Sequence, residues 1–412
     1  MLTVPRNPSM VELMLSDNDC APIDVKMERS KKRGRRMRTI VPFVLSLAIA
    51  GSAAAQPGVP PIELIEKKIA AGRDTIQDHI TLMNLYTGAR NIEKRREQIL
   101  WLIAHNPENP QFRTLTSNIG ADSFLPDAEG LAQASELWRA VIARPDVPAA
   151  ALTNAAWFFR LTDLDFAWSI VKAAEESHRD DLEMKRIRGM LDALTMLHSD
   201  TAAAAHARAQ VDSSNDARLL IGAADTLTQP PFNPNSRGLT MDDRFDVAEK
   251  WLLRAREVAP EDRDGKVALS RIYGMQAGQV ADARWKMELY RRANTLAPNA
   301  FTLQQLAFAE YEAGEDDAAL KTVERMLENK PVTPNVPHIA HTVRGLVALD
   351  RKQVDEAKAE LLESAKMTMN IEPDRTLAQA LIDAGERDVV VQFLEACRTF
   401  WKNDRGALDY YI

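Results

Sequence analysis

The stretch from Ala300 to Pro331 has the pattern of two short helices joined by a tight turn, and similar landmarks recur along most of the chain. Leu303 and Ala307 lie four residues apart, so they share one face of the first predicted helix. Gly314 marks the turn, and Pro331 ends the second helix. A recurring helix–turn–helix unit restricts the chain to an all-α fold made of stacked helix pairs.

Small residues recur where the two helices of a pair must cross, because only a small side chain leaves room for close backbone approach. These crossing residues are Ala155, Ala167, Ala248, Ala319, Gly345 and Ala357. Larger apolar residues follow one turn later and fill the adjoining groove, namely Val171, Leu252, Val323 and Leu361. The spacing from Ala248 to Pro260 equals that from Ala319 to Pro331. This double match indicates a true repeat.

The unit resembles the tetratricopeptide repeat, whose period is about 34 residues and whose pattern is W-x2-L-G-x2-Y, then A-x3-F, then P. The resemblance implies a right-handed α-solenoid of about eight to nine antiparallel helix pairs across residues 56–402. Residues 403–412 then form a C-terminal tail. The stretch from Gly278 to Pro298 is about one helical turn longer than its counterpart, which predicts a lengthened second helix there.

The N-terminal 55 residues have the features of an extension followed by a secretory signal peptide. A basic segment, Lys31 to Arg38, precedes an apolar run from Ile40 to Ala50, and Ala53 to Ala55 supply a small-residue cleavage site. The apolar run is about 11 residues, whereas a spanning helix needs roughly 20. We therefore expect a signal at about 27–55 or 37–55, export to the periplasm or medium, and no stable membrane anchor after cleavage.

The net charge of the predicted mature chain bears on its binding partners, and its cysteine content bears on reactive thiols. Cleavage after Ala55 removes 9 of 52 basic and 5 of 59 acidic residues, which leaves a net charge of −11. An acidic protein is a poor nucleic-acid binder, so we expect no nucleic-acid partner. Only Cys20 and Cys397 are present, and Cys397 fits a buried helical position better than a reactive thiol.

No known catalytic or cofactor-binding motif occurs in the sequence, so we expect neither an enzyme activity nor a cofactor. The phosphate-binding, dinucleotide-binding, zinc-protease and serine-hydrolase signatures are all missing. His338 and His341 could share a helix face and bind a metal, but no third ligand is near in sequence, which favours packing. The acidic runs at Glu261–Asp262 and Glu315–Asp317 open helices, where carboxylates are favoured, so we interpret them as structural.

An insertion at Thr228–Gly238, between the predicted helices at 216–227 and from Thr240, interrupts the repeat. It is rich in proline and has Phe232 near its centre, and Thr240 with Asp243 forms a capping box that restarts the helix. Long insertions in repeat proteins are often functional, and a passive loop is the alternative. Phe232 is therefore a candidate contact residue.

In tetratricopeptide repeats the first helix of each pair lines the concave surface, and the resemblance implies the same here. The side chains on that free face are the predicted partner-binding set: Leu152, Phe159, Phe301, Gln304, Phe308, Tyr311, Leu346 and Leu349. They are mainly apolar and aromatic, so the expected guest is a protein or an apolar or aromatic-bearing peptide. The alternative is that successive first helices bury these side chains against each other.

The expected function is that of an exported, periplasmic scaffold for protein–protein interaction. One alternative is a glycan-active α/α toroid, which also stacks helix pairs but closes on itself and carries carboxylates at one mouth. Another is an accessory solenoid of a cell-envelope complex. The spacing and the small crossing residues favour the open repeat over the toroid.

Overall fold

The computed structural model describes residues 62–114, 117–120, 123, 125–228, 239–328, 335–366 and 373–401. Within these ranges every regular element is helical, comprising eighteen α-helices and one short 3-10 helix. The predicted all-α class is therefore confirmed.

The helices alternate with short connections along the whole described chain. In the N-terminal half they are α1 (Ile62–Ala70), α2 (Ile76–Gly88), α3 (Ile92–His105), η2 (Pro110–Arg113), α4 (Ala128–Ile142), α5 (Ala149–Phe159), α6 (Leu164–Ser177), α7 (Leu182–His198), α8 (Thr201–Ser213) and α9 (Ala217–Thr228). In the C-terminal half they are α10 (Met241–Val258), α11 (Arg263–Gln279), α12 (Ala283–Leu296), α13 (Ala300–Glu312), α14 (Asp316–Glu328), α15 (Asn335–Asp350), α16 (Val354–Ser364), α17 (Thr376–Asp383) and α18 (Arg387–Cys397).

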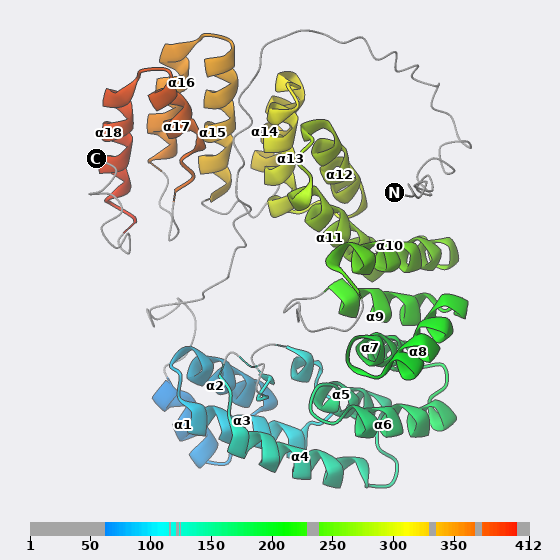
Figure 1. Cartoon of the computed structure of the whole chain (residues 1–412). Coiled ribbons are helices and arrows are strands. Elements are labelled where there is room, and N and C mark those ends of the chain that lie inside the picture. The colour runs from blue at the N-terminus through cyan, green and yellow to red at the C-terminus, as the bar shows by residue number, and fades with distance from the viewer. Residues whose placement is uncertain are drawn as a thin grey trace. The chain divides into compact units, whose positions relative to one another are not determined.

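Each α-helix packs against the next one along the chain (Figure 1). Helices two positions apart also touch in several places, as α5 does with α7 and α13 with α15. This nearest-neighbour packing defines a solenoid, in which each unit is stabilised by the units beside it. The eighteen described helices agree with the upper end of the predicted eight to nine pairs.

The predicted crossing residues lie in the interior. Ala155, Ala167, Ala248, Ala319 and Ala357 are fully buried, as are the larger residues Val171, Leu252, Val323 and Leu361. At Gly345 an added Cβ would lie 2.2 Å from a methyl carbon of Leu377 on α17. The small-residue rule used on the sequence is therefore confirmed.

Several turns between consecutive helices use one residue in the left-handed region. Gly314 (φ 79°) and Gly385 (φ 92°) follow α13 and α17, where glycine adopts this conformation without steric cost. Lys352 (φ 63°) and Arg90 (φ 54°) hold the same place after α15 and α2. The turn geometry thus recurs where the sequence has no glycine to mark it.

Two local predictions about helix ends can be checked against the structure. The capping box of Thr240 and Asp243 is present at the start of α10. The predicted lengthening of a second helix after Gly278 is wrong. Gly278 lies inside α11, which has 17 residues, whereas α12 has 14 and α14 has 13. The extra turn belongs to the first helix of that pair, because the helical hydrogen bonds continue through a glycine that has open space around it.

Helices α7 and α9 approach each other unusually closely. An added Cβ at Gly189 of α7 would lie 2.0 Å from the carbonyl oxygen of Leu219, and one at Gly222 of α9 would lie 2.0 Å from that of Arg186. Two glycines facing opposite backbones allow this contact, since any larger residue would meet backbone atoms rather than a movable side chain. Neither glycine was identified in the sequence.

A buried arginine organises the connection between α3 and α4. The guanidinium of Arg95 is almost fully buried and donates hydrogen bonds to the hydroxyl of Thr87 (3.1 Å) and to the carbonyl oxygens of Leu125 (3.4 Å) and Asn118. The next residue, Arg96, pairs with both carboxylate oxygens of Asp127 at 2.7 Å. Asp127 is also the N-cap of α4, so the two arginines tie the connection and the next helix to α3.

The predicted N-terminal segment 1–55, residues 229–238 of the insertion and the tail 403–412 lie outside the described residues, whereas Thr228 is the last residue of α9. Among the helices that are described, none combines the length and the hydrophobicity needed to cross a bilayer.

Candidate functional site

The candidate site is built on α13 and α15, the first helices of two neighbouring pairs. Asn299 caps α13 and forms a reciprocal capping box with Thr302, which fixes the start and therefore the register of the helix. With this register Leu303 and Ala307 point into the core, whereas Phe301 is 56% exposed. The packed face predicted from the sequence is confirmed.

Contact between α13 and α15 brings four of the predicted residues into one cluster. Leu346 is a buried member of an apolar cluster formed by α15 to α18, and Phe308, Tyr311 and Leu349 pack against it. Phe308 and Tyr311 also pack against the cluster that joins α13, α14 and α15. We call Phe301, Phe308, Tyr311, Leu346 and Leu349 the aromatic stripe.

The residues of the aromatic stripe differ in how much of each side chain is exposed to solvent. Phe301 is exposed, Phe308, Tyr311 and Leu349 are half-buried, and Leu346 is buried. The half-buried rings are therefore held in place by packing while part of each surface stays open. Rigid aromatic side chains that are partly exposed are typical of the anchors in protein interfaces.

For three predicted residues the expectation of a free side chain is wrong. Phe159 is buried among aromatic rings, with Phe158 and Phe166 edge-on at 5.0 and 4.8 Å between ring centroids. Gln304 is buried, and its side-chain oxygen accepts a hydrogen bond from Asn335 of α15 at 3.3 Å. Leu346 is covered as described above. Gln304 and Leu346 match the alternative of burial between successive first helices, whereas Phe159 is covered by a ring of its own helix and one of α6.

Leu152 and Phe232, the other two predicted contact residues, are not part of the stripe. Leu152 is partly buried and packs against the cluster of α2 to α7, far along the chain from the stripe. Phe232 is outside the described residues. A role in partner binding for any of the nine residues stays a prediction.

The acidic runs lie at helix starts, as predicted. Asp262 caps α11 by accepting hydrogen bonds from the backbone of Asp264 and Gly265. At the start of α14, Glu315 pairs with Arg291 (2.6 Å) and Asp317 with Arg351 (2.7 Å). Each of these carboxylates has a structural partner, whereas the toroid alternative needs carboxylates aimed at a substrate.

The two histidines considered for metal binding are engaged separately. Nδ1 of His338 lies 3.2 Å from the carbonyl oxygen of Ser364, and Nε2 accepts the backbone N–H of Asp374 at 2.8 Å. Burial lowers the pKa of His338, which keeps the ring neutral. Nδ1 of His341 instead lies 2.6 Å from the carboxylate of Glu360. No group of three or more potential metal ligands occurs among the described residues.

The tryptophans and the cysteine have mostly structural positions. Trp138 and Trp251 are fully buried between helices, but Trp285 on α12 is 39% exposed and lies beneath the guanidinium of Arg292. Cys397 is buried, and burial raises the pKa of its thiol to about 12, so the thiol stays protonated.

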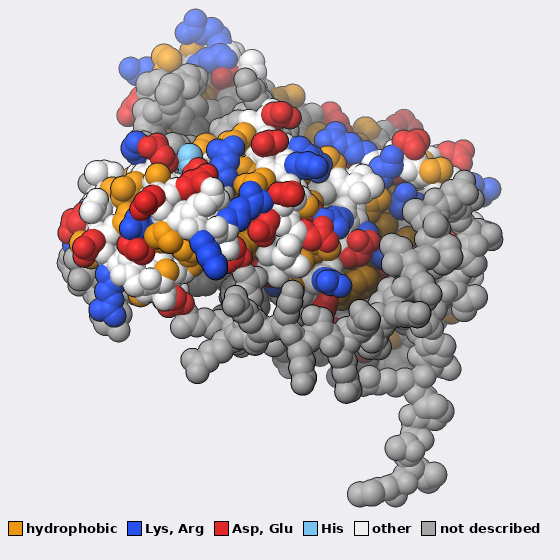
Figure 2. All heavy atoms as spheres, turned by 90° about the horizontal axis from the view of Figure 1, so that it is seen from above, with side chains coloured by type: hydrophobic (Ala, Val, Ile, Leu, Met, Phe, Trp, Pro, Cys, Tyr) orange, Lys and Arg blue, Asp and Glu red, His pale blue; other side chains and the backbone are white. Residues whose placement is uncertain are grey.

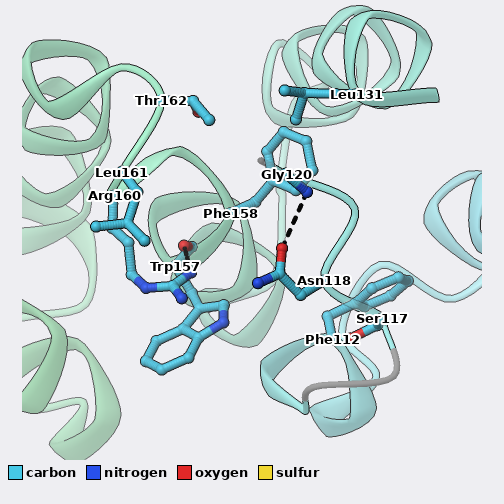
Figure 3. Close-up of a pocket in the computed structure, with 10 residues that line it drawn as sticks. All are labelled: Phe112, Ser117, Asn118, Gly120, Leu131, Trp157, Phe158, Arg160, Leu161 and Thr162. Carbon is cyan, nitrogen blue, oxygen red and sulfur yellow. Dashed lines mark hydrogen bonds between the residues drawn. The ribbon is translucent and has the colours of Figure 1, made fainter. Parts of the chain in front are cut away.

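A small cleft lies where α4 and α5 meet the residues that follow η2 (Figure 3). Trp157 and Arg160 line it, with the guanidinium carbon 3.9 Å from the centroid of the indole ring, and Asn118 accepts a hydrogen bond from the backbone of Gly120 in the loop that forms part of the wall. Its inner space of about 20 Å³ suits one water molecule. A cleft of this size is too small for a cofactor or a metabolite.

The surface around the helices carries both signs of charge. In Figure 2, Lys, Arg, Asp and Glu side chains alternate with hydrophobic ones over the described part of the visible face. No broad basic area appears there. Nucleic-acid binding depends on such an area, so this face gives it no support.

No family model matches the chain, and no curated protein is similar to it in sequence. Solved structures with some likeness include a human IFIT1 dimer with m7Gppp-AAAA, at 13% identity and a TM-score of 0.36, covering 85% of this chain and 84% of that chain. Another is a tetratricopeptide repeat protein from Parabacteroides merdae, at 12% identity and a TM-score of 0.27, covering 78% and 98%. Yeast Tom70 has 13% identity and a TM-score of 0.19, covering 85% and 90%. At these scores the likeness assigns no family, so the classification as an all-α solenoid of tetratricopeptide-like helix pairs rests on the packing of its own helices.

Proposed function

We propose that the chain is an exported scaffold that binds a protein or peptide partner through the aromatic stripe. The observation that carries this proposal is the packing of Phe308 and Tyr311 between α13 and α15, which leaves both rings half-buried on the same helix that carries the exposed Phe301. An exposed phenylalanine ring leaves apolar surface in water, and covering it with a partner would be favourable.

The chemistry of the stripe indicates an apolar segment as the partner. Aromatic and aliphatic side chains at helical spacing bind an amphipathic helix or an extended apolar peptide by burying its hydrophobic side. The aromatic rings would supply the contact area at low entropic cost, because they are already fixed by packing.

Photo-crosslinking tests this proposal without disturbing the core. A photoreactive phenylalanine analogue at position 301 should form one discrete adduct with a partner in intact cells, because that side chain is exposed beside the stripe. Leu64 on α1 is a matched control, since it is apolar and 59% exposed but lies at the other end of the described chain. Equal labelling from both positions, or none from position 301, would argue against the stripe.

Export is the second part of the proposal and rests on the order of the basic segment, the apolar run and the Ala-rich site. We expect the mature protein to begin at or near Gln56. N-terminal sequencing of protein from the cell envelope checks this, and recovery of chains that still begin at Met1 or Met27 would contradict it.

A further inference from the structure

A buried carboxyl group lies in α7 without a hydrogen-bond partner for one of its oxygens. Asp192 is only 3% exposed, and its Oδ2 has no partner among the described residues. A buried polar atom that lacks a partner costs free energy, so its presence calls for an explanation. The stripe and the proposed scaffold function make no use of this residue.

The register of α7 turns Asp192 toward α8. Met196 lies one turn further on the same face, and it belongs to the same apolar cluster as Ala207 and Val211 of α8. These two residues are the only buried ones on α8. The carboxyl group therefore faces a helix that offers it small apolar side chains and that is itself held by few buried contacts.

The cation that acts on the Asp192 carboxyl group is Arg188, which also interacts with Glu175. Arg188 lies one turn before Asp192, and its Nη1 pairs with Glu175 of α6 at 2.9 Å, while its Nε is buried without a hydrogen-bond partner. Arg188 attracts the charged form of Asp192 and Glu175 opposes it. Arg188 is thus placed between two carboxyl groups and has a donor free for the second.

The other helices that pack on α7 bring no competing charge. Helix α5 carries no charged residue, and Lys172 of α6 is exposed to solvent. Arg208 and Asp212 of α8 pair with each other at 2.8 Å, and Asp225 of α9 pairs with Arg186. Burial raises the pKa of Asp192 to about 7, so the group is neutral in acid and changes charge near neutral pH.

We propose that Glu175, Arg188 and Asp192 form a proton-operated switch. When Asp192 is protonated, Arg188 pairs with Glu175 and joins α7 to α6. When Asp192 loses its proton, the new carboxylate needs a cation in its apolar surroundings, so it competes with Glu175 for Arg188, which turns its unused Nε toward Asp192 and shares its charge between the two carboxylates. The ionised state weakens the α6–α7 pairing and places a charge against α8, so both helices open more readily above neutral pH.

The direction of the pH dependence follows from proton binding. The folded state keeps the Asp192 proton up to about pH 7, whereas the unfolded chain loses it near pH 3.8. Between these values the folded state binds more protons, so stability falls as the pH rises through this range and levels off above it.

Amide hydrogen exchange at pH 6 and pH 8, corrected for the intrinsic exchange rate, tests the switch. The opening of α6 and α8 should increase by up to about tenfold at pH 8 in the native protein, and this increase should disappear in Asp192→Asn. Asp165→Asn is the control, because Asp165 is an exposed carboxylate on α6 and its loss should leave the pH effect in place.

If Asp192→Asn does not fold, the variant Glu175→Gln and a direct titration of the Asp192 carboxyl group test the same switch. Glu175→Gln should let Arg188 pair with Asp192 at both pH values, so the change between pH 6 and pH 8 should again vanish. The carboxyl ¹³C shift of Asp192 should titrate near pH 7. A midpoint near pH 4, or a pH effect that persists in either variant, would overturn the switch.

Discussion

Replacing Gly222 with Ala should cost about 3 kcal/mol or more of the free energy of unfolding. The added methyl group would lie 2.0 Å from the carbonyl oxygen of Arg186, so α9 must move away from α7 and lose packing on both sides of the crossing. Urea unfolding followed by circular dichroism measures this loss.

Gly274 provides the matched control for this substitution. It lies inside α11 with no atom within 4 Å of an added Cβ. Ala at this position should stabilise the protein by about 0.5–1 kcal/mol, because alanine loses less backbone entropy in a helix than glycine. If the two alanine variants had the same stability, the close α7–α9 crossing would be wrong.

Arg95→Ala should be similarly damaging, with an expected loss of about 3–5 kcal/mol. The substitution removes a buried charge that satisfies the hydroxyl of Thr87 and two backbone carbonyl groups, which are then left without these donors. The connection between α3 and α4 should open first, and hydrogen exchange of that connection would detect it.

The neighbouring Lys94 is the control for Arg95. Its side chain is exposed and pairs with Glu97 at 3.3 Å, so Lys94→Ala should change stability by no more than about 0.5 kcal/mol. An equally small effect of Arg95→Ala would mean that the buried guanidinium does not hold this connection.

Local sequence patterns predicted the features that depend on residues close together in the chain. Helical periodicity placed Leu303 and Ala307 on the buried face of α13, and small residues such as Ala319 marked the crossings. The capping box at Thr240 was also predictable, because its two residues are three positions apart. Helix existence, helix faces and caps are encoded within one or two turns, so a single sequence is enough to find them.

Features that depend on distant partners could not be predicted in the same way. Gly222 contacts Arg186, 36 residues earlier, and Arg95 reaches Leu125, 30 residues later. A single glycine in a helix or one arginine in a basic run gives no sign of such a contact. The carboxyl of Asp192 is equally inconspicuous, since its burial depends on how α8 folds back on α7.

The candidate site was predictable in part for the same reason. The spacing of Phe301, Phe308 and Tyr311 places them on neighbouring sides of α13, and the structure joins two of them to Leu346 and Leu349 through α15. Phe159 was assigned to a free face, but the adjacent helices α4 and α6 cover it through Arg139 and Phe166. Helical periodicity identifies the side of a helix, whereas tertiary packing decides whether that side is covered.

The affinity of the crosslinked partner for a stripe variant tests the central claim most directly. The double variant Phe308→Ala and Tyr311→Ala should bind at least about thirtyfold more weakly, since truncation of an aromatic anchor typically costs 2 kcal/mol or more. Trp285→Ala should bind normally, because this exposed aromatic residue lies on α12, outside the stripe. Circular dichroism must show that the double variant is folded, and its collapse would support burial between helices as the role of these rings. Unchanged affinity in a folded double variant would contradict the proposal that the aromatic stripe binds the partner.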